Sequence, residues 1–335
     1  MSDHPTMLPN RRHALAVMSA SLGALCSPFV HAQAQTPYPA RPVRMIVPTA
    51  AGSGSDLIAR MLARQLTQSL GQPVIVENRA GASGMIGVEA VVRAPADGYT
   101  LLMSSLSPVV INPMIFKKLS VDPREGLVPV SKVGIAPVAL LVNASLPAQT
   151  LAEFLALARK QELSYGSFGA GSGTHLGREA LCQAAGVKMV HVPYRGTGPA
   201  VSDLLAGQIS ATMTDLATAQ THITSGKLRA LAINGSKRSP LLPQVPTYTE
   251  QGFPSVEGTY ASFALFAPRD TPAAIVQRLS GDVVAALKLP EMGERFREQG
   301  YTLEGSTPSQ LAETLKMDSA RWNSVLTGLG GLTLD

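Results

Sequence analysis

The stretch VRMIVPTAAGSGSD, residues 43–56, decides the fold class. Val43 to Val47 is a short, β-branched apolar run that is typical of a buried strand, and the small residues Pro48 to Ser55 predict a turn. From Asp56 to Leu70, apolar residues recur at helical spacing. The stretch therefore predicts one strand, turn and helix unit of an α/β protein.

The same unit recurs along the chain. Further short apolar strands are expected at residues 74–76, 98–103, 139–142, 163–165, 189–192 and 211–213. Alternating strands and helices predict parallel, doubly wound sheets with helices on both faces. Two sets of such units, followed by a helix-rich tail from Thr271 to Leu326, indicate two α/β lobes.

The first 32 residues have the features of an export signal. Arg11 and Arg12 form a positive start, residues 14–25 are small and apolar, and Val30-His31-Ala32 fits the small-x-small pattern of a cleavage site. Adjacent arginines also fit a twin-arginine signal, so export by the Sec or the Tat route stays open. No later segment offers the roughly 20 apolar residues of a membrane-spanning helix, so we expect a soluble periplasmic protein.

The charge of the chain argues against nucleic acid as a partner. The formal charge of +5 falls to +4 when two arginines and Asp3 leave with the leader. Basic residues are scattered singly and aromatic residues are few, whereas a nucleic-acid-binding surface clusters both.

Motifs for cofactors, metals and nucleophilic catalysis are missing from the sequence. Thr174 stands where a dinucleotide-binding turn needs its third glycine, and Ala170 stands where a nucleophile elbow needs its first. The mature histidines have no metal-ligand spacing, and Cys182 has no partner and is interpreted as a core residue. We therefore expect no metal, no cofactor and no disulfide.

Two glycine-rich turns, PTAAGSGSD (48–56) and GSFGAGSGTH (166–175), each end a strand and open a helix. Glycine lets a ligand approach the backbone, and the unpaired N–H groups and dipole of a helix start favour an anion. Either turn alone is equally well explained as chain reversal, but one in each half indicates a clamp. The candidate ligand-binding residues are Thr49, Ala51, Gly52, Ser53, Ser55 and Asp56 in the first turn and Ser167, Gly169, Ala170, Ser172, Thr174 and His175 in the second.

Further candidates lie at other predicted strand ends. Arg195 could pair with a carboxylate or be a solvated loop charge, and Thr197 follows in the same loop. Asp215 could receive a ligand amine or hydroxyl, or cap the helix that follows. Ser105 follows a third strand, where its hydroxyl could line a cleft or satisfy the turn.

Several blocks of the sequence occur in the order found in one known family. They are YPARPVRMIVP (38–48), GQPVIVENRAGASGMIG (71–87), ADGYTLL (96–102), INP (111–113), YGSFGAGSGTHL (165–176), VPYRGTGPAVSDLLAGQ (192–208), GKLRALA (226–232) and FAPRDTPAAIV (266–276). With these blocks the chain resembles the Bug family, the substrate-binding proteins of tripartite tricarboxylate transporters. The resemblance covers nearly the whole mature chain.

The resemblance implies a type II periplasmic-binding-protein fold, with two doubly wound lobes and a cleft between them. It places residues 37–137 and 260–335 in lobe 1 and residues 138–259 in lobe 2, so that the tail returns to the first lobe. It also implies that the turns around Thr49 and Gly169 grip a ligand carboxylate.

The leading functional hypothesis is a monomeric extracytoplasmic protein, not an enzyme, that binds a small organic carboxylate. Dicarboxylates, acidic amino acids and aromatic acids are the expected ligands, and the membrane subunits of a tripartite tricarboxylate-type transporter are the expected partners. Two alternatives stay open. One is a sensor that reports to a membrane kinase, and the other is an enzyme on the same scaffold with His175 or Asp215 as a base.

Overall fold

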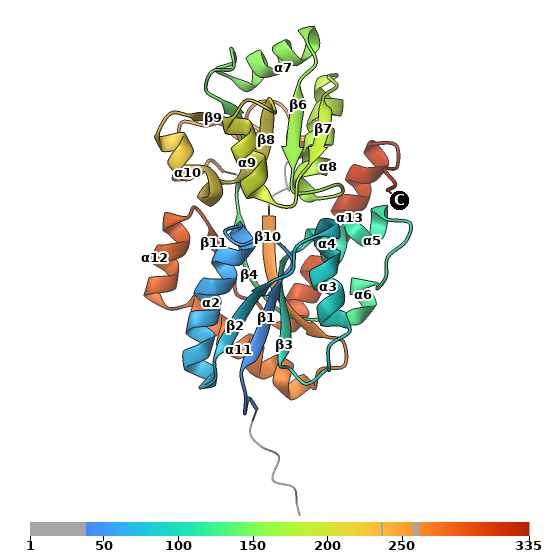
Figure 1. Ribbon diagram of the computed structural model, residues 1–335, viewed down its shortest axis with the longest axis vertical. Coiled ribbons are helices and arrows are strands. Elements are labelled where there is room, and N and C mark those ends of the chain that lie inside the picture. The colour runs from blue at the N-terminus through green and yellow to red at the C-terminus, as the bar shows by residue number, and fades with distance from the viewer. Residues whose placement is uncertain (1–37, 236, 257–260, 335) are drawn as a thin grey trace, which may run out of the picture. The chain divides into compact units, whose positions relative to one another are not determined.

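The computed structural model describes residues 38–235, 237–256 and 261–334, so the expected export signal lies outside the described residues. Figure 1 shows an α/β arrangement in which strands form two separate sheets with helices packed around each. Within these ranges, no helix combines the length and apolar character required to cross a membrane.

The first sheet has six strands and contains the deciding stretch as its strand β1. In spatial order its strands are β11 (Thr302–Leu303), β4 (Leu127–Ala136), β10 (Ala261–Pro268), β3 (Thr100–Ser105), β1 (Val43–Val47) and β2 (Val74–Asn78). Around it lie α2 (Gly54–Leu70), η1 (Ala82–Gly84), α3 (Met85–Val92), α4 (Ser107–Val110), α5 (Asn112–Ile115), α6 (Pro123–Gly126), α11 (Ala273–Leu287), α12 (Pro290–Glu298) and α13 (Pro308–Gly328).

The second sheet has five strands, which are β7 (Val190–Pro193), β6 (Ser164–Ser167), β8 (Ala211–Asp215), β5 (Val138–Asn143) and β9 (Leu228–Asn234) in spatial order. Its helices are α7 (Leu151–Lys160), α8 (Gly173–Ala185), α9 (Thr197–Leu205), α10 (Leu216–Thr224) and the short η2 (Pro254–Val256). The chain crosses from the first sheet to the second at Pro137, between β4 and β5, and returns through the segment before β10.

The expectation of parallel sheets is only partly correct, because both sheets are mixed. β1 pairs in parallel with β2 and β3, and β6 does so with β7 and β8. In contrast, β10 runs antiparallel to β3 and β4, and β5 runs antiparallel to β8 and β9. β11 also runs antiparallel to β4. A strand and helix pattern does not reveal these directions.

Both faces of each sheet are buried, as expected for a doubly wound fold. Successive residues Met45 and Ile46 of β1 are fully buried but belong to different apolar clusters, because side chains alternate across a strand. In β5, Leu140 and Leu141 divide in the same way. Alternate residues of these near-continuous apolar strands thus pack into the apolar clusters on opposite faces of the sheet.

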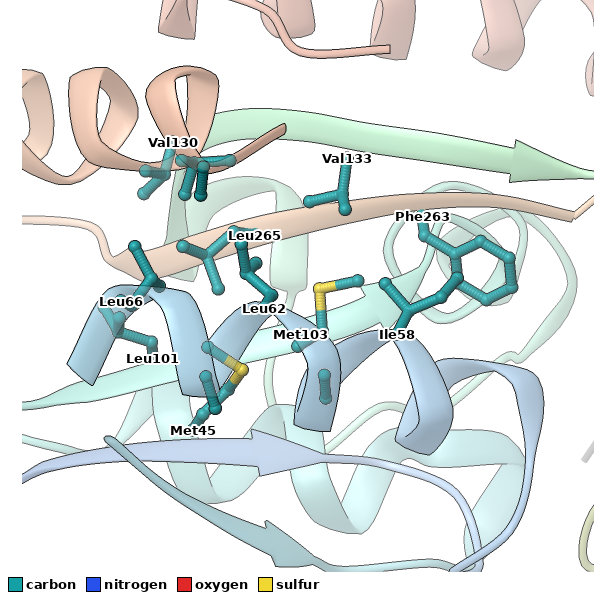
Figure 2. Close-up of a cluster of buried hydrophobic side chains, with 14 of the residues drawn as sticks. Met45, Ile58, Leu62, Leu66, Leu101, Met103, Val130, Val133, Phe263 and Leu265 are labelled. Atoms are coloured by element: carbon teal, nitrogen blue, oxygen red, sulfur yellow. The ribbon is translucent and has the colours of Figure 1, made fainter. Parts of the chain in front are cut away.

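Helix α2 shows how the sequence pattern becomes packing. Ile58, Leu62 and Leu66 recur every four residues, are fully buried and share one cluster with sheet residues such as Met103 and Leu265 (Figure 2). Burying one such side chain contributes about 1.5 to 3 kcal/mol. The helix ends where Gly71 takes a left-handed conformation that residues with a Cβ disfavour.

The helix-rich tail packs on the six-stranded sheet. Helix α11 packs against α2 and β4, and α13 packs against β4 and also reaches α8 of the second sheet. The start of α13 has the expected capping box, in which Thr307 and Gln310 satisfy each other's backbone amides.

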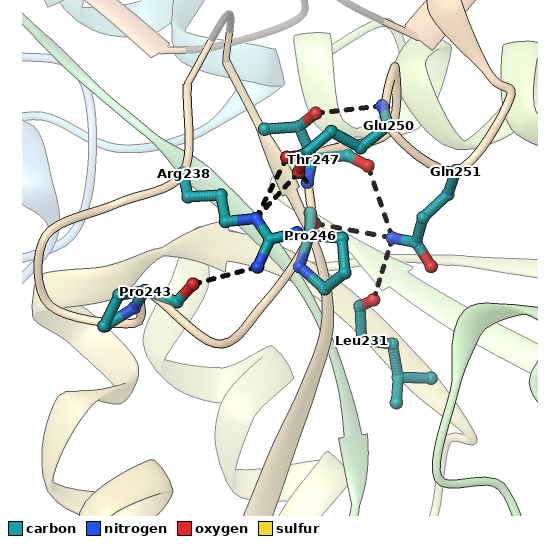
Figure 3. Close-up of polar contacts among 7 residues, drawn as sticks. All are labelled: Leu231, Arg238, Pro243, Pro246, Thr247, Glu250 and Gln251. Carbon is teal, nitrogen blue, oxygen red and sulfur yellow. Dashed lines mark hydrogen bonds and ion pairs between the residues drawn. The ribbon is translucent and has the colours of Figure 1, made fainter.

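Residues 238–251, which follow β9, make polar contacts with one another and with that strand. Arg238 donates from Nε to both oxygens of Glu250, at 3.0 and 2.9 Å, and from Nη1 to the carbonyl of Pro243 (Figure 3). Gln251 donates to the carbonyl of Leu231 in β9. The contact of Gln251 therefore ties residues 238–251 to β9.

Candidate functional site

Loop 1, residues 48–53, joins β1 to α2. Its last residue, Ser53, is the N-cap of α2, and its hydroxyl accepts from the amide of Asp56 and lies 2.6 Å from the hydroxyl of Thr49. Gly52 has a φ of 80°, a left-handed conformation that favours glycine. Loop 1 therefore combines a sharp turn with two adjacent hydroxyls at a helix start.

Asp56 is buried at the start of α2 and holds loop 1 in place by hydrogen bonding. Its carboxylate accepts from the amide of Gly52 at 2.9 Å, from Arg60 Nε at 3.0 Å and from Asn78 Nδ2 at 3.0 Å. Burial raises the pKa of this carboxyl, but the hydrogen bonds from Arg60, Gly52 and Asn78 outweigh burial and hold the pKa below its usual value. Asp56 is thus ionised at neutral pH, and its oxygens are engaged with the protein.

Loop 2, residues 168–172, joins β6 to α8, and its end is also an N-cap. The hydroxyl of Ser172 accepts from the amide of His175 at 3.3 Å. Gly171 has a φ of 76°, and an added Cβ would clash with Ile115 of the six-stranded side. The glycine is therefore required both by the turn and by the close approach of a segment from the other sheet.

The prediction that loop 2 presents free amides is wrong for several of its residues. The amide of Phe168 donates to Thr174 Oγ1, that of Gly169 to Ser167 Oγ, and that of Gly171 to His175 Nδ1, at 3.0 to 3.2 Å. Side chains compete for these donors because a buried N–H without a partner is costly. The side chains of Ser167, Thr174 and His175 therefore stabilise the conformation of loop 2 by accepting its backbone hydrogen bonds.

His175 belongs to a stack of rings beneath loop 2. Its ring lies 3.9 Å from that of His191, and Tyr165 stacks on His191 at 5.0 Å. Burial lowers the pKa of both histidines to about 4, so both are neutral at neutral pH. Because His175 Nδ1 accepts from Gly171, its proton lies on Nε2. His191 Nε2 lies 2.7 Å from Ser167 Oγ, which extends the support of the loop.

A third segment, residues 81–84, was not among the predicted site residues. Ala82 and Ser83 have left-handed φ values of 46° and 52° although neither is glycine, and such backbone strain clusters at functional sites. Ser83 Oγ donates to the carbonyl of Ala170 in loop 2 at 2.8 Å, and Asn112 Nδ2 donates to the carbonyl of Ser83 at 3.0 Å. The segment thus connects the first sheet to loop 2.

Asp215 ends β8 and caps α10, which was one of its two expected roles. Its carboxylate accepts from the amide and the hydroxyl of Thr218 and from the hydroxyl of Tyr301. Burial raises the pKa of this carboxyl, and the hydrogen bonds from Thr218 and Tyr301 oppose that shift. Tyr301 comes from the tail, so this contact joins the two sheets as well.

Loops 1 and 2 meet at two adjoining cavities, of about 90 and 40 Å³. Thr49, Ser105, Phe168 and Gly196 line both cavities. The larger one is also lined by Pro48, Gly81, Ala82, Ser83, Gly84, Ser107, Pro108, Asn112, Gly169, Ser172, Tyr194 and Arg195. The smaller one is also lined by Ser53, Gly54, Ser55, Thr197, Asp215, Ala261 and Phe263.

The predicted site residues divide into two groups at these cavities. The cavity-lining ones are Thr49, Ser53, Ser55, Ser105, Gly169, Ser172, Arg195, Thr197 and Asp215. Those outside the two linings are Ala51, Gly52, Asp56, Ser167, Ala170, Thr174 and His175. Ala51 and Gly52 are exposed at the tip of loop 1, and the hydrogen bonds described above place most of the others behind the loops.

The electrostatics of the larger cavity favour an anion. Arg195 is exposed at its wall, and its guanidinium makes no ion pair with any residue in the described ranges. Its described lining includes hydroxyls and an amide but no Asp or Glu. An entering carboxylate would therefore find donors and a cation without a competing negative charge.

Metal and thiol chemistry find little support in the described part of the chain. It contains no group of three or more His, Cys, Asp or Glu placed to hold a metal ion. Cys182 is buried in α8, as expected, and burial raises the pKa of its thiol, which disfavours the reactive thiolate.

Comparison with known proteins assigns the family. The model of the tripartite tricarboxylate transporter family receptor matches residues 58–330. The chain belongs to this receptor family. The resemblance found in the sequence is thereby confirmed, and similar proteins include BugT of Bordetella pertussis, which is 40% identical over 296 residues, 88% of this chain and 90% of BugT.

Solved structures of similar proteins share the fold. A protein of R. palustris solved with adipate superimposes with a TM-score of 0.85 at 32% identity, covering 89% of this chain and all of the other. MatC of Rhodopseudomonas palustris, solved with bound malate, gives 0.81 at 31% identity over 86% of this chain and all of MatC. The periplasmic binding protein BugD gives 0.83 at 32% identity over 89% of this chain and all of BugD.

Proposed function

We propose that this receptor captures a small organic carboxylate in the periplasm and delivers it to the membrane subunits of a tripartite tricarboxylate-type transporter. The observation that carries the proposal is the larger cavity. It is formed by loops from both sheets, offers hydroxyls and the unpaired Arg195, and has no described acidic side chain in its wall. Relatives solved with adipate and malate support a carboxylate as the ligand.

The cavity volume supports a small ligand. About 90 Å³ is far below the roughly 300 to 1,000 Å³ of pockets for drug-sized molecules. We propose that residues 37–137 with 260–335 and residues 138–259 form two lobes that move apart to admit the ligand. The contact between Ser83 and Ala170 would then form on closure.

Binding without turnover is part of the proposal. His175 has its Nδ1 occupied by the amide of Gly171, and the oxygens of Asp215 accept from Thr218 and Tyr301. Neither group is therefore poised to take a proton from a ligand in this conformation. We propose that the expected Sec or Tat signal delivers a mature, monomeric chain that begins after Ala32.

A panel of mono- and dicarboxylates, screened by thermal shift and then by titration calorimetry, tests this function. Binders should raise the melting temperature and be recovered unchanged by mass spectrometry. Arg195→Gln should weaken binding of the acid by about 1 to 2 kcal/mol, which raises its dissociation constant roughly 5- to 30-fold. The matched control is Arg64→Gln, exposed on α2 outside both cavity walls.

Two results would overturn the proposal. The first is a panel in which no carboxylate binds the mature protein. The second is chemical conversion of a bound acid by the protein alone. Fractionation of cells that express the full chain tests the compartment, and recovery of the uncleaved chain in the cytoplasm would contradict the expected export.

A further inference from the structure

Asn112 is a buried amide that is satisfied on one side only. It begins α5, lines the larger cavity and is 1% exposed. Its Nδ2 donates to the carbonyl of Ser83 at 3.0 Å. Its Oδ1 has no hydrogen-bond partner within the described ranges, and burial keeps bulk water from supplying one.

The orientation of this amide follows from chemistry. A backbone carbonyl can only accept a hydrogen bond, so the group that faces the carbonyl of Ser83 has to be the NH₂. The remaining group is therefore a carbonyl oxygen, an acceptor. An unpaired buried acceptor is unfavourable, which indicates that a donor arrives from outside the described structure.

One neighbouring hydroxyl of the protein is engaged elsewhere. Ser83, whose carbonyl holds the amide, already donates its own hydroxyl to Ala170. Arg195 and the small hydroxyls of the cavity suit the carboxylate of the proposed function. A ligand that carries a donor beside its carboxylate would satisfy both kinds of group at once.

We propose that Asn112 determines specificity by accepting a hydrogen bond from a ligand hydroxyl, so that the preferred ligands are hydroxycarboxylates. A neutral hydroxyl fits better than an ammonium group, because the described wall of the larger cavity has no carboxylate to balance a positive charge. Asp215, in the smaller cavity, already accepts from Thr218 and Tyr301. This inference rests on the proposed function.

The test compares each unsubstituted acid with its 2-hydroxy derivative in titration calorimetry. The pairs are propionate and lactate, succinate and malate, and glutarate and 2-hydroxyglutarate. One neutral hydrogen bond predicts that the hydroxy acid binds about 3- to 10-fold more tightly. 2-Methoxysuccinate, which keeps the oxygen but lacks the donor, should bind no better than succinate.

Variants separate recognition from structure. Asn112→Leu should bring the two affinities of a pair to within about twofold, because it removes the acceptor at similar size. Ser83→Ala is the matched control, since it removes the contact with Ala170 but leaves the side chain of Asn112 in place. It should weaken both members of a pair by the same factor, and melting curves report whether each variant is folded.

The outcomes distinguish this inference from the proposed function. If unsubstituted acids bind as tightly as their hydroxy derivatives, the inference fails and the function stands. Tighter binding of aspartate than of malate would overturn the assignment to a hydroxyl. If Asn112→Leu keeps the wild-type preference for the hydroxy acid, another residue binds the ligand hydroxyl and the inference fails. Binding by no acid of either kind refutes the function itself.

Discussion

Replacing Arg178 by methionine is expected to stabilise the protein. Arg178 lies in α8, is fully buried, and none of its three guanidinium nitrogens has a hydrogen-bond partner in the described part of the chain. Its charge lies 5.5 Å from the ring centres of both Phe154 and Tyr165. Aromatic faces are thus the only compensation for this charge that the described residues show.

The magnitude follows from two opposing effects. Each cation–π contact contributes about 0.5 to 2 kcal/mol. Removing the charge from water costs several kcal/mol, and hydrophobic residues in place of buried charges can stabilise proteins by about 1 to 4 kcal/mol. Methionine keeps the length and packing of the side chain without its charge, so Arg178→Met should raise the free energy of unfolding by about 1 to 4 kcal/mol.

Urea unfolding followed by circular dichroism measures this change. The control is Arg159→Met on neighbouring α7, because Arg159 is exposed and donates to the carbonyl of Ala185. The control should alter the free energy of unfolding by at most about 0.5 kcal/mol. A loss of stability in Arg178→Met, restored by Arg178→Lys, would refute the reasoning and reveal a bound water or anion at the buried charge.

Two further predictions concern loop 2. Because the pKa of His175 and His191 falls from 6.5 to about 4 on folding, the unfolded chain binds more protons below pH 6.5. The free energy of unfolding should therefore fall by up to about 1.4 kcal/mol per pH unit and histidine between pH 6.5 and 4. His191→Gln should reduce this slope in urea titrations, and an unchanged slope would contradict the assignment, with His222→Gln as control. Gly171→Ala should lower the free energy of unfolding by about 1 to 3 kcal/mol more than the control Gly186→Ala. Both glycines are left-handed, but only an added Cβ at Gly171 meets another side chain. Equal losses of stability in the two variants would argue against that packing.

The alternation of apolar runs and glycine-rich turns was sufficient to predict the α/β class, because each βα unit is encoded locally. Strand direction was not encoded in this way. β10 was not among the strands expected from the sequence, and in the six-stranded sheet it runs antiparallel to β3. Such a direction depends on where the chain comes from, which involves contacts between residues far apart in sequence.

The candidate site was predictable to the extent that it consists of strand ends. Thr49, Ser105 and Ser172 were predicted because ligand sites in α/β sheets lie beyond the carboxyl ends of strands, and all three line the larger cavity. Asn112 and Ser83, which line the same cavity, were not among the predicted site residues. The left-handed conformation of Ser83 could not be predicted, because a serine in the sequence does not indicate a positive φ.

Two buried aspartates beside a cavity that suits an anion require an explanation. Asp56 receives hydrogen bonds from Gly52, Arg60 and Asn78, and the ion pair with Arg60 balances its charge. Asp215 is bound by Thr218 and Tyr301, and burial raises its pKa. Each carboxylate is held by donors of the protein, so its field at the cavity is reduced while its hydrogen bonds fix a helix start. The two aspartates therefore hold the starts of α2 and α10, and under the proposed function recognition of the carboxylate would fall to the hydroxyls and to Arg195.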